Sequence, residues 1–176
     1  ILKQKYIKTA ELDAEILMAK AIGKDRKYLI LNNNKYLDIK NLKYFRKLIK
    51  ERASRKPIAY ITNKKNFWNY DFFITNDTLI PRPDTELVIE QILELTKNKN
   101  KMNILDIGVG SGCILLSILK ERKNFYGTGI DISKNCLNIS RKNAKKLKVD
   151  TRTRFYKSDV DKFARGKYDL IVSNPP

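Results

Sequence analysis

The sequence predicts an α/β fold in which a small helical region and a β-hairpin precede a parallel sheet. Two patterns support this prediction. From residue 103 onward, short apolar runs typical of strands alternate with helical runs, an order that builds a parallel sheet through right-handed crossovers. Before residue 63, apolar residues instead recur at steps of three and four, which is typical of amphipathic helices.

The helical region is expected to form a small all-α domain over residues 1–63. Its predicted helices span residues 9–23, 25–31 and 41–53. Gly23 is placed to stop the first helix. Pro57 lies beyond the third helix, which it cannot continue.

A β-hairpin linker is expected next, over residues 64–80. Aromatic and β-branched residues are frequent in residues 66–74 and are interrupted by polar turn formers, as in a pair of short strands. Two prolines then favour an extended segment. Asp84 or Thr85 follows in a position to cap a helix that runs through residue 94.

The remaining chain, residues 81–176, is expected to be a partial sheet domain. Its predicted strands span residues 103–107, 127–132, 153–157 and 168–173, and its predicted helices span residues 113–120 and 136–147. The sheet would be incomplete at its C-terminal end, because the last strand would expose an apolar edge that further elements should cover. We therefore expect a fragment of a longer protein, weakly stable or aggregating when isolated.

The composition excludes several kinds of chemistry. The chain contains no histidine, which excludes a Ser-His-Asp triad, a histidine general base and the usual histidine metal sites. Its two cysteines have neither the number nor the spacing of a disulfide framework or a zinc site. We expect no metal, so any chemistry must use backbone groups, amides, carboxylates or a cofactor.

The charge and hydropathy of the chain bear on its partners and location. The net charge of +18 favours a nucleic acid or a ribonucleoprotein such as the ribosome as a neighbour. The alternative is a lysine-rich composition that only decorates solvated faces. No uncharged stretch is long enough to span a bilayer, and the N-terminus lacks the apolar block of a signal peptide. We expect a cytoplasmic monomer without membrane contact.

A glycine-rich loop follows the first predicted strand of the sheet and opens a helix, where an open α/β sheet binds its ligand. Gly108, Gly110 and Gly112 have the spacing Gly-x-Gly-x-Gly, which matches neither a dinucleotide fingerprint nor a Walker loop. Asp131 ends the next strand, at a spacing suited to accept hydrogen bonds from ribose hydroxyls. Together they indicate an adenosine cofactor without a pyrophosphate, such as S-adenosylmethionine. A tight turn with an exposed aspartate is the alternative.

Asn174, Pro175 and Pro176 follow the last predicted strand at the same edge of the sheet. Pro175 restricts Asn174 to an extended geometry, so the Asn174 Oδ1 and the Pro175 carbonyl can accept both hydrogens of an amide NH₂. A nitrogen held in this way would face the methyl group of a sulfonium, and such a transfer depends on orientation more than on acid–base catalysis. A simple turn is the alternative.

Six segments carry the motifs of a known family. They are Ile80–Glu86 (Ile-Pro-Arg-Pro-Asp-Thr-Glu), Leu105–Gly112, Gly129–Asp131, Ile171–Pro176, Asp13–Leu17 and Lys56–Ile61. These segments resemble the release-factor glutamine methyltransferases, also called the HemK family. Pro-Arg-Pro-Asp-Thr-Glu is the most specific motif; the glycine loop is similar to that of class I methyltransferases in general, and Asn-Pro-Pro to enzymes that methylate planar nitrogens. By this resemblance the chain ends inside an Asn-Pro-Pro-Tyr motif.

The resemblance implies a class I methyltransferase domain with a Rossmann-like parallel sheet, and it assigns roles to residues. The residues implied to hold S-adenosylmethionine are Gly108, Val109, Gly110, Ser111, Gly112, Asp131, Val160 and Asn174. Val160 stands where the family often has an aromatic residue against the adenine. The residues implied to contact the substrate are the catalytic Asn174 and Pro175, with Pro176, Arg82, Thr85 and Glu86. For the last three, a helix-capping turn is the alternative.

The resemblance further implies an enzyme that methylates the side-chain amide nitrogen of the Gly-Gly-Gln glutamine in peptide chain release factors. Residues 1–63 would then recognise the substrate. Two alternatives remain: a DNA or rRNA base amino-methyltransferase with the same Asn-Pro-Pro grip, and an inactive truncated binding module. We expect the 176-residue segment alone to be inactive.

Overall fold

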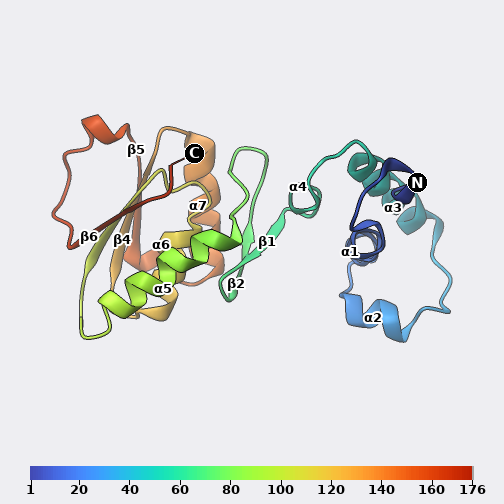
Figure 1. Cartoon of the computed structure of the whole chain (residues 1–176), viewed down its shortest axis with the longest axis horizontal. Coiled ribbons are helices and arrows are strands. Elements are labelled where there is room, and N and C mark those ends of the chain that lie inside the picture. Colours follow the sequence, from blue (N-terminus) through green and yellow to red (C-terminus); the bar gives the residue numbers. More distant parts are fainter. Residues whose placement is uncertain (176) are drawn as a thin grey trace. The chain divides into compact units, whose positions relative to one another are not determined.

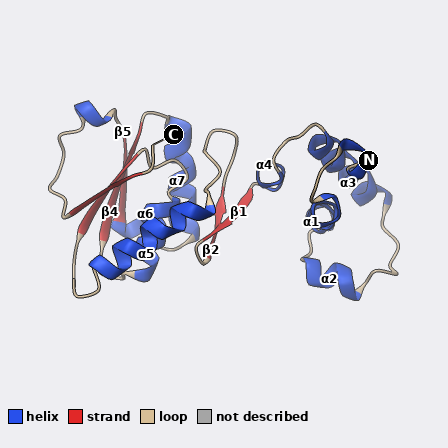
Figure 2. Ribbon diagram, viewed as in Figure 1, coloured by secondary structure: helices blue, strands red, loops and turns tan. Residues whose placement is uncertain are grey.

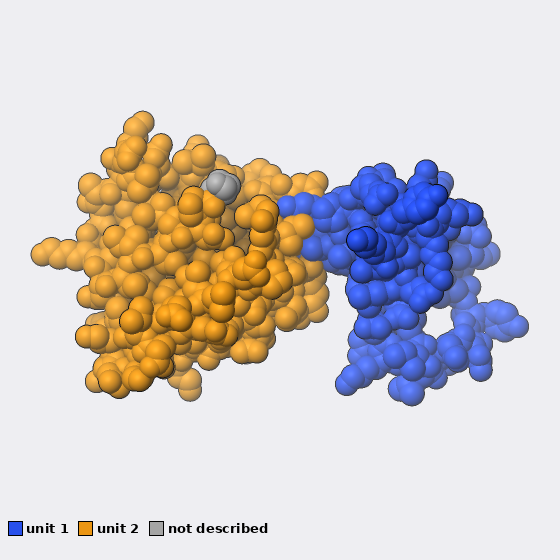
Figure 3. All heavy atoms as spheres, in the orientation of Figure 1, with its two compact units in different colours: residues 1–63 blue, residues 64–176 orange. Residues whose placement is uncertain are grey.

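The structure, a computed structural model, describes residues 1–175 and forms two compact units, Ile1–Asn63 and Lys64–Pro176 (Figure 3). The first unit is helical. The second contains the hairpin, the parallel sheet and the helices packed on it. The prediction of an α/β fold with a helical N-terminal part, a β-hairpin and a parallel sheet is confirmed.

The helices of the first unit begin and end where local capping groups allow. They are the 3₁₀ turn Lys3–Lys5, α1 (Ala10–Ile22), α2 (Arg26–Leu31), α3 (Ile39–Ala53) and α4 (Ile58–Thr62). Gly23 ends α1 in the left-handed region, with φ 67°. The side chains of Asp25 and Asp38 cap α2 and α3, so α3 begins two residues earlier than predicted. α4 was not predicted.

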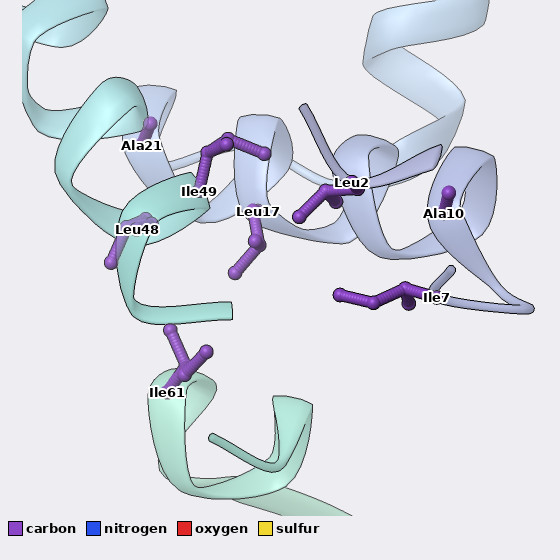
Figure 4. Packing of buried hydrophobic residues seen from close by; sticks show 8 residues of the cluster. All are labelled: Leu2, Ile7, Ala10, Leu17, Ala21, Leu48, Ile49 and Ile61. Atoms are coloured by element: carbon purple, nitrogen blue, oxygen red, sulfur yellow. The ribbon is translucent and has the colours of Figure 1, made fainter. Parts of the chain in front are cut away.

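The core of the first unit is a small apolar cluster shared by α1, α3 and α4. Figure 4 shows the side chains of Leu17, Leu48 and Ile61 gathered between these helices. The N-terminal residues Leu2 and Ile7 complete the cluster. Because these buried residues come from distant parts of residues 1–63, their packing joins the helices into one unit.

A buried ion pair ties α1 to α3 inside this unit. Asp13 is only 3% exposed, and its Oδ2 accepts a hydrogen bond of 2.6 Å from the Arg52 Nε. The Arg52 Nη1 also donates to the Lys56 carbonyl at 3.1 Å. A buried carboxylate without its partner would keep the cost of leaving water and lose the compensating attraction.

The hairpin consists of β1 (Lys64–Phe67) and β2 (Tyr70–Phe73), paired antiparallel around a tight turn (Figure 2). Trp68 in this turn has φ 53°, a conformation that large side chains rarely adopt. Its backbone N–H donates to Glu86 Oε1 at 2.8 Å, and its indole Nε1 donates to Glu121 Oε1 at 2.9 Å. Two glutamates from neighbouring helices therefore hold the turn.

The helix after the hairpin begins differently from the prediction. Pro83–Thr85 forms a 3₁₀ turn that leads directly into α5 (Glu86–Leu95). Thr85, at the N-cap, already has helical backbone angles and makes no side-chain capping hydrogen bond. The predicted side-chain cap is therefore wrong, because the preceding turn supplies a helical start without one.

The sheet contains four parallel strands in the order β5-β4-β3-β6 (Figure 1). The strands are β3 (Asn103–Ile107), β4 (Tyr126–Asp131), β5 (Thr153–Lys157) and β6 (Leu170–Ser173), and the crossover helices are α6 (Cys113–Glu121) and α7 (Lys134–Lys146). Predicted and observed boundaries agree within two residues. Two 3₁₀ turns, Asp150–Arg152 and Val160–Lys162, were not predicted.

The helices pack closely on the sheet because β4 carries glycines where they approach. A Cβ at Gly127 would lie 2.7 Å from the Leu115 Cδ1 of α6, and one at Gly129 would lie 2.8 Å from the Val109 Cγ2. Larger residues at these positions would push the helix and the glycine loop away from the strand. Among the described residues, no helix is both long and apolar enough to cross a bilayer.

The ion pair between α1 and α3 leads to the first testable prediction. Arg52→Ala should destabilise the first unit by about 3–5 kcal/mol, because it leaves Asp13 buried and unpaired. Hydrogen–deuterium exchange of α1 amides would report the free energy of opening. The double variant Asp13→Ala/Arg52→Ala should recover part of the loss, and Arg46→Ala, at an exposed position of α3, is the control. Equal effects of Arg52→Ala and Arg46→Ala would contradict the prediction.

Candidate cofactor and acceptor site

A cavity of about 470 Å³ lies at the carboxyl ends of β3, β4 and β6. The glycine loop, residues 130–133, the turn after β5 and the segment after β6 line it. Its size is within the range of roughly 300–1,000 Å³ that is typical of small-molecule sites. Among the described residues, its lining includes the carboxylates Asp131 and Asp159 but no lysine or arginine.

The glycine loop turns sharply beneath this cavity. Gly108, Gly110 and Gly112 have φ of 72°, 54° and 80°, which other residues rarely adopt. A Cβ at Gly108 would meet no atom within 4 Å, so the backbone there faces open space that a ligand can approach. Gly112 has a different role, because a Cβ there would lie 2.8 Å from the Leu116 Cδ1.

Hydrogen bonds from outside the loop hold its backbone in place. The Asp131 Oδ2 accepts the Gly110 N–H at 3.0 Å. From α7, the Ser140 Oγ donates to the Gly110 carbonyl at 2.8 Å, and the Asn143 Nδ2 donates to the Ser111 carbonyl at 2.9 Å. The loop is thus fixed from two sides, by the end of β4 and by one helix.

Asn143 also joins the loop to the hairpin. This residue is fully buried, its Oδ1 accepts the Phe73 N–H at 2.7 Å, and its Nδ2 donates to the Phe73 carbonyl at 2.9 Å. One amide therefore satisfies backbone groups of β2 and of the glycine loop together. Sequence reasoning missed Asn143, because a single asparagine inside a lysine-rich helix gives no sign of its long-range partners.

Asp131 combines a structural role with exposure to the cavity. Besides Gly110, it binds the backbone N–H of Ser133 through Oδ1 at 2.8 Å. A carboxylate has about four lone-pair positions, so each oxygen can accept one further hydrogen bond. Because Asp131 lines the cavity, those positions are available to hydroxyl groups of a ligand.

A second acidic residue, Asp106 in β3, is buried next to the loop. Burial raises its pKa to about 7; a hydrogen bond from the Leu115 backbone N–H opposes the shift, and the negative charge of Asp131 adds to it. Burial also raises the pKa of the Cys113 thiol to about 12, so this thiol stays protonated at neutral pH. Neither residue was predicted to belong to the site.

The segment after β6 brings Asn174 and Pro175 to the cavity. The Asn174 Nδ2 donates to the Thr85 Oγ1 at 3.3 Å. With its amide nitrogen engaged, Asn174 keeps its Oδ1 free to accept a hydrogen bond from another group. Pro176, predicted to contact the substrate, lies outside the described residues.

The structure brings some predicted site residues together and separates others. Those that line the cavity are Gly108, Gly110, Asp131, Val160, Asn174 and Pro175. Those outside its lining are Val109, Ser111, Gly112, Arg82, Thr85 and Glu86. Val109 and Ser111 have buried side chains, so only their backbone could approach a ligand, and Glu86 holds the hairpin turn instead.

The cavity also has lining residues that were not predicted. Ile132 and Ser133 follow β4 directly, and Ser158 follows β5, so their place after a parallel strand was an available signal. Leu79 belongs to the segment between the hairpin and α5, and nothing in its local sequence indicates that this segment reaches the cavity. Among the described residues, no cluster of side chains suited to a metal ion is present.

The raised pKa of Asp106 predicts a specific pH dependence of stability. The folded state holds this proton up to about pH 7, whereas the unfolded chain releases it near pH 4, so stability should fall as pH rises between these values. From pH 5 to 7.5 the loss should be about 2–3 kcal/mol, at roughly 1.4 kcal/mol per pH unit. Asp106→Asn should remove it.

Urea unfolding followed by the fluorescence of Trp68, the one tryptophan of the chain, would measure this effect in the second unit. Asp161→Asn, at an exposed position, is the matched control and should leave the pH dependence unchanged. The same pH dependence in the Asp106→Asn variant and the unmodified protein would show that Asp106 is ionised throughout.

Known protein families and a solved structure resemble parts of the chain. Residues 84–176 match the family model described as the methyltransferase small domain, and residues 1–62 match the one described as the PrmC N-terminal domain. A solved RNA methyltransferase from Salinibacter ruber in complex with S-adenosyl-L-homocysteine gives a TM-score of 0.47 at 24% identity, over 53% of this chain and 60% of that one.

Two curated relatives are named release factor glutamine methyltransferase. The protein from Leptospira interrogans is 41% identical over 179 residues, which cover 99% of this chain and 63% of that protein. The protein from Buchnera aphidicola subsp. Baizongia pistaciae is 38% identical over 176 residues, which cover 98% and 62%. The chain thus spans less than two thirds of these relatives. The resemblance predicted from the motifs is confirmed, and the chain belongs to the methyltransferase small domain family.

Proposed function

We propose that the protein transfers a methyl group from S-adenosylmethionine to the side-chain amide nitrogen of the Gly-Gly-Gln glutamine in peptide chain release factors. One observation carries this proposal: the glycine loop, Asp131 and Asn174–Pro175 line a single cavity. The names of the relatives support the substrate. Such a reaction belongs in the cytoplasm, where the protein would act as a monomer.

The cavity suits the proposed cofactor in size, shape and charge. Open space above Gly108 lets a ligand approach the loop, and Asp131 can accept hydrogen bonds from ribose hydroxyls. The described lining residues include carboxylates and no cation, although the chain has 37 Lys and Arg against 19 Asp and Glu. That lining favours a positively charged sulfonium over a polyphosphate. When bound, the cofactor supplies an electrophilic methyl group.

The residues after β6 are suited to hold the acceptor amide. The Asn174 Oδ1 and the Pro175 carbonyl can accept the two N–H bonds of a glutamine side chain, which would point its nitrogen at the cofactor. Thr85 supports this arrangement, because it accepts from the Asn174 Nδ2 and so leaves Oδ1 for the substrate. Orientation of this kind can contribute ~7–11 kcal/mol to lowering a barrier.

The helical unit is assigned a role in recognising the release factor. It matches the PrmC N-terminal domain model over residues 1–62, and its own core keeps it folded as a separate unit. Methylation of a DNA or rRNA base amine is the second candidate, because the same acceptors suit an exocyclic NH₂ and the net charge is +18. A methyl-transfer experiment with Asn174→Ala therefore offers both kinds of acceptor.

Asn174→Ala in the complete protein should lower kcat for methyl transfer to a release factor by at least about 100-fold, since the acceptor loses one of its two holding groups. Affinity for S-adenosylhomocysteine, measured by isothermal titration, should change less than about threefold. Transfer of tritium from labelled S-adenosylmethionine to a release factor, an rRNA fragment and a DNA duplex would measure the rate and the acceptor class. If either nucleic acid were labelled faster than the release factor, the proposal that the methyl acceptor is a protein would be overturned.

Asp131→Ala should mainly weaken cofactor binding, whereas Asn174→Ala should mainly slow methyl transfer. It removes the ribose acceptor and the bond that holds Gly110, so S-adenosylhomocysteine affinity should fall by at least about tenfold. The same titration would measure this loss, and Asp150→Ala, an exposed carboxylate outside the cavity lining, is the matched control. An unchanged affinity in the Asp131→Ala variant would place the cofactor elsewhere.

The contact between Thr85 and Asn174 can be tested separately. Thr85→Ser keeps the acceptor oxygen and should retain most of the methyl transfer rate. Thr85→Val has a similar shape without the hydroxyl, so kcat should fall by about tenfold with little change in cofactor affinity. Equal rates for both variants would show that Thr85 does not orient Asn174.

A further inference from the structure

A second cavity, of about 390 Å³, lies at the amino ends of the sheet strands. Asn103, Tyr126 and Thr153, the first residues of β3, β4 and β5, line it together with the segment before β6. Among the described residues, it shares no lining residue with the cofactor cavity. On β4 and β5 their lining residues are two positions apart, Thr128 against Ile130 and Tyr156 against Ser158, which is about 7 Å of strand.

The charge of this second cavity is positive and uncompensated. Arg152, Arg154, Arg165 and Lys167 line it, and no carboxylate is among its described lining residues. In the described part of the chain, none of the four forms an ion pair. The nearby Asp169 is occupied, since its Oδ2 accepts the Asn103 N–H at 2.7 Å.

Arg152 is fixed in place by backbone carbonyls rather than by a counterion. Its Nη1 donates to the Arg122 and Phe125 carbonyls at 3.0 and 2.7 Å, and its Nη2 donates to the Leu119 carbonyl at 2.6 Å. These neutral partners orient the guanidinium without cancelling its charge. The cavity thus has a fixed cation in its wall and further cations, such as Arg154 and Lys167, around it.

Aromatic rings lie between these cations. Tyr126, Tyr156 and Tyr168 line the cavity. Phe163 stacks on Tyr168 with ring centroids 6.4 Å apart and lies 5.8 Å from Tyr156, so these rings support one another. The Arg165 guanidinium lies 5.2 Å from the centre of the Tyr156 ring. Tyr126 is 44% exposed, and the Lys101 Nζ lies 5.5 Å from the centre of its ring.

We propose that this cavity binds single-stranded RNA, whose phosphates pair with the cations while a base stacks on a tyrosine. Uncompensated cations interleaved with rings are the combination by which proteins hold single strands without reading their sequence. An acidic peptide would use the cations alone, whereas a base could also stack on the exposed part of the Tyr126 ring. Because Asn174 is not among the described lining residues of this cavity, the bound RNA is a ligand and not the methyl acceptor. The inference does not depend on the proposed methyl transfer.

Fluorescence anisotropy with a labelled 12-nucleotide RNA, at 50 and 200 mM salt, would test this proposal on the complete protein. Removing three cavity cations together (Arg154→Ala, Arg165→Ala, Lys167→Ala) should weaken binding by at least about tenfold and reduce the salt slope by about 2. The matched control removes three exposed lysines elsewhere on the same unit (Lys123→Ala, Lys134→Ala, Lys145→Ala) and should weaken binding less than about threefold. Circular dichroism would confirm that both variants are folded.

Tyr126→Thr should weaken RNA binding by a further factor of about 5 to 10, because stacking on a ring contributes roughly 1–3 kcal/mol per base. A polyglutamate peptide of equal charge should bind at least tenfold more weakly than the RNA. Equal losses in the cavity and control variants would overturn the proposal in favour of diffuse attraction. Equal affinity for polyglutamate and RNA, or no RNA binding at 50 mM salt, would also overturn it.

Discussion

The backbone of the glycine loop has to be held by side chains from outside the loop, and the candidate site depends on this constraint. Gly108, Gly110 and Gly112 all have positive φ, and glycine loses more conformational freedom on folding than any other residue. The order comes from Asp131 at the end of β4 and from Ser140 and Asn143 on α7. α7 therefore covers the sheet with its apolar residues and fixes the ligand-facing turn with its polar ones.

The same polar contacts make the hairpin part of the site's framework. Asn143 binds Phe73 in β2 as well as the loop, and Glu86 and Glu121 hold the turn at Trp68. Burial, with the nearby Glu121 carboxylate, raises the pKa of Tyr70 to about 12, so its hydroxyl remains a donor to Glu121. The hairpin is thereby anchored to three helices, and the chain that leaves it reaches the cavity at Leu79.

Sequence alone predicted what depends on local pattern, and missed what depends on distant partners. The strands β3 and β5 were placed without error, because alternating strands and helices leave a strong signal in short apolar runs. α4 was missed because five residues are too few to show a helical period. Asn143 and Asp106 were missed for another reason: the backbone groups they bind, and the burial that raises the pKa of Asp106, exist only in the folded unit.

The large positive charge of the chain indicates a ligand only when the positions of the charged residues on the sheet are considered. A solvated, composition-driven excess of lysine would place cations around both cavities. Instead, the described lining at the carboxyl ends of the strands contains Asp131 and Asp159 without a cation, while the lining at the amino ends contains four cations without a carboxylate. Opposite charges at opposite ends of the same strands would draw a sulfonium to one end and a polyanion to the other. The two ligands can therefore be bound together, because neither competes electrostatically for the other's cavity.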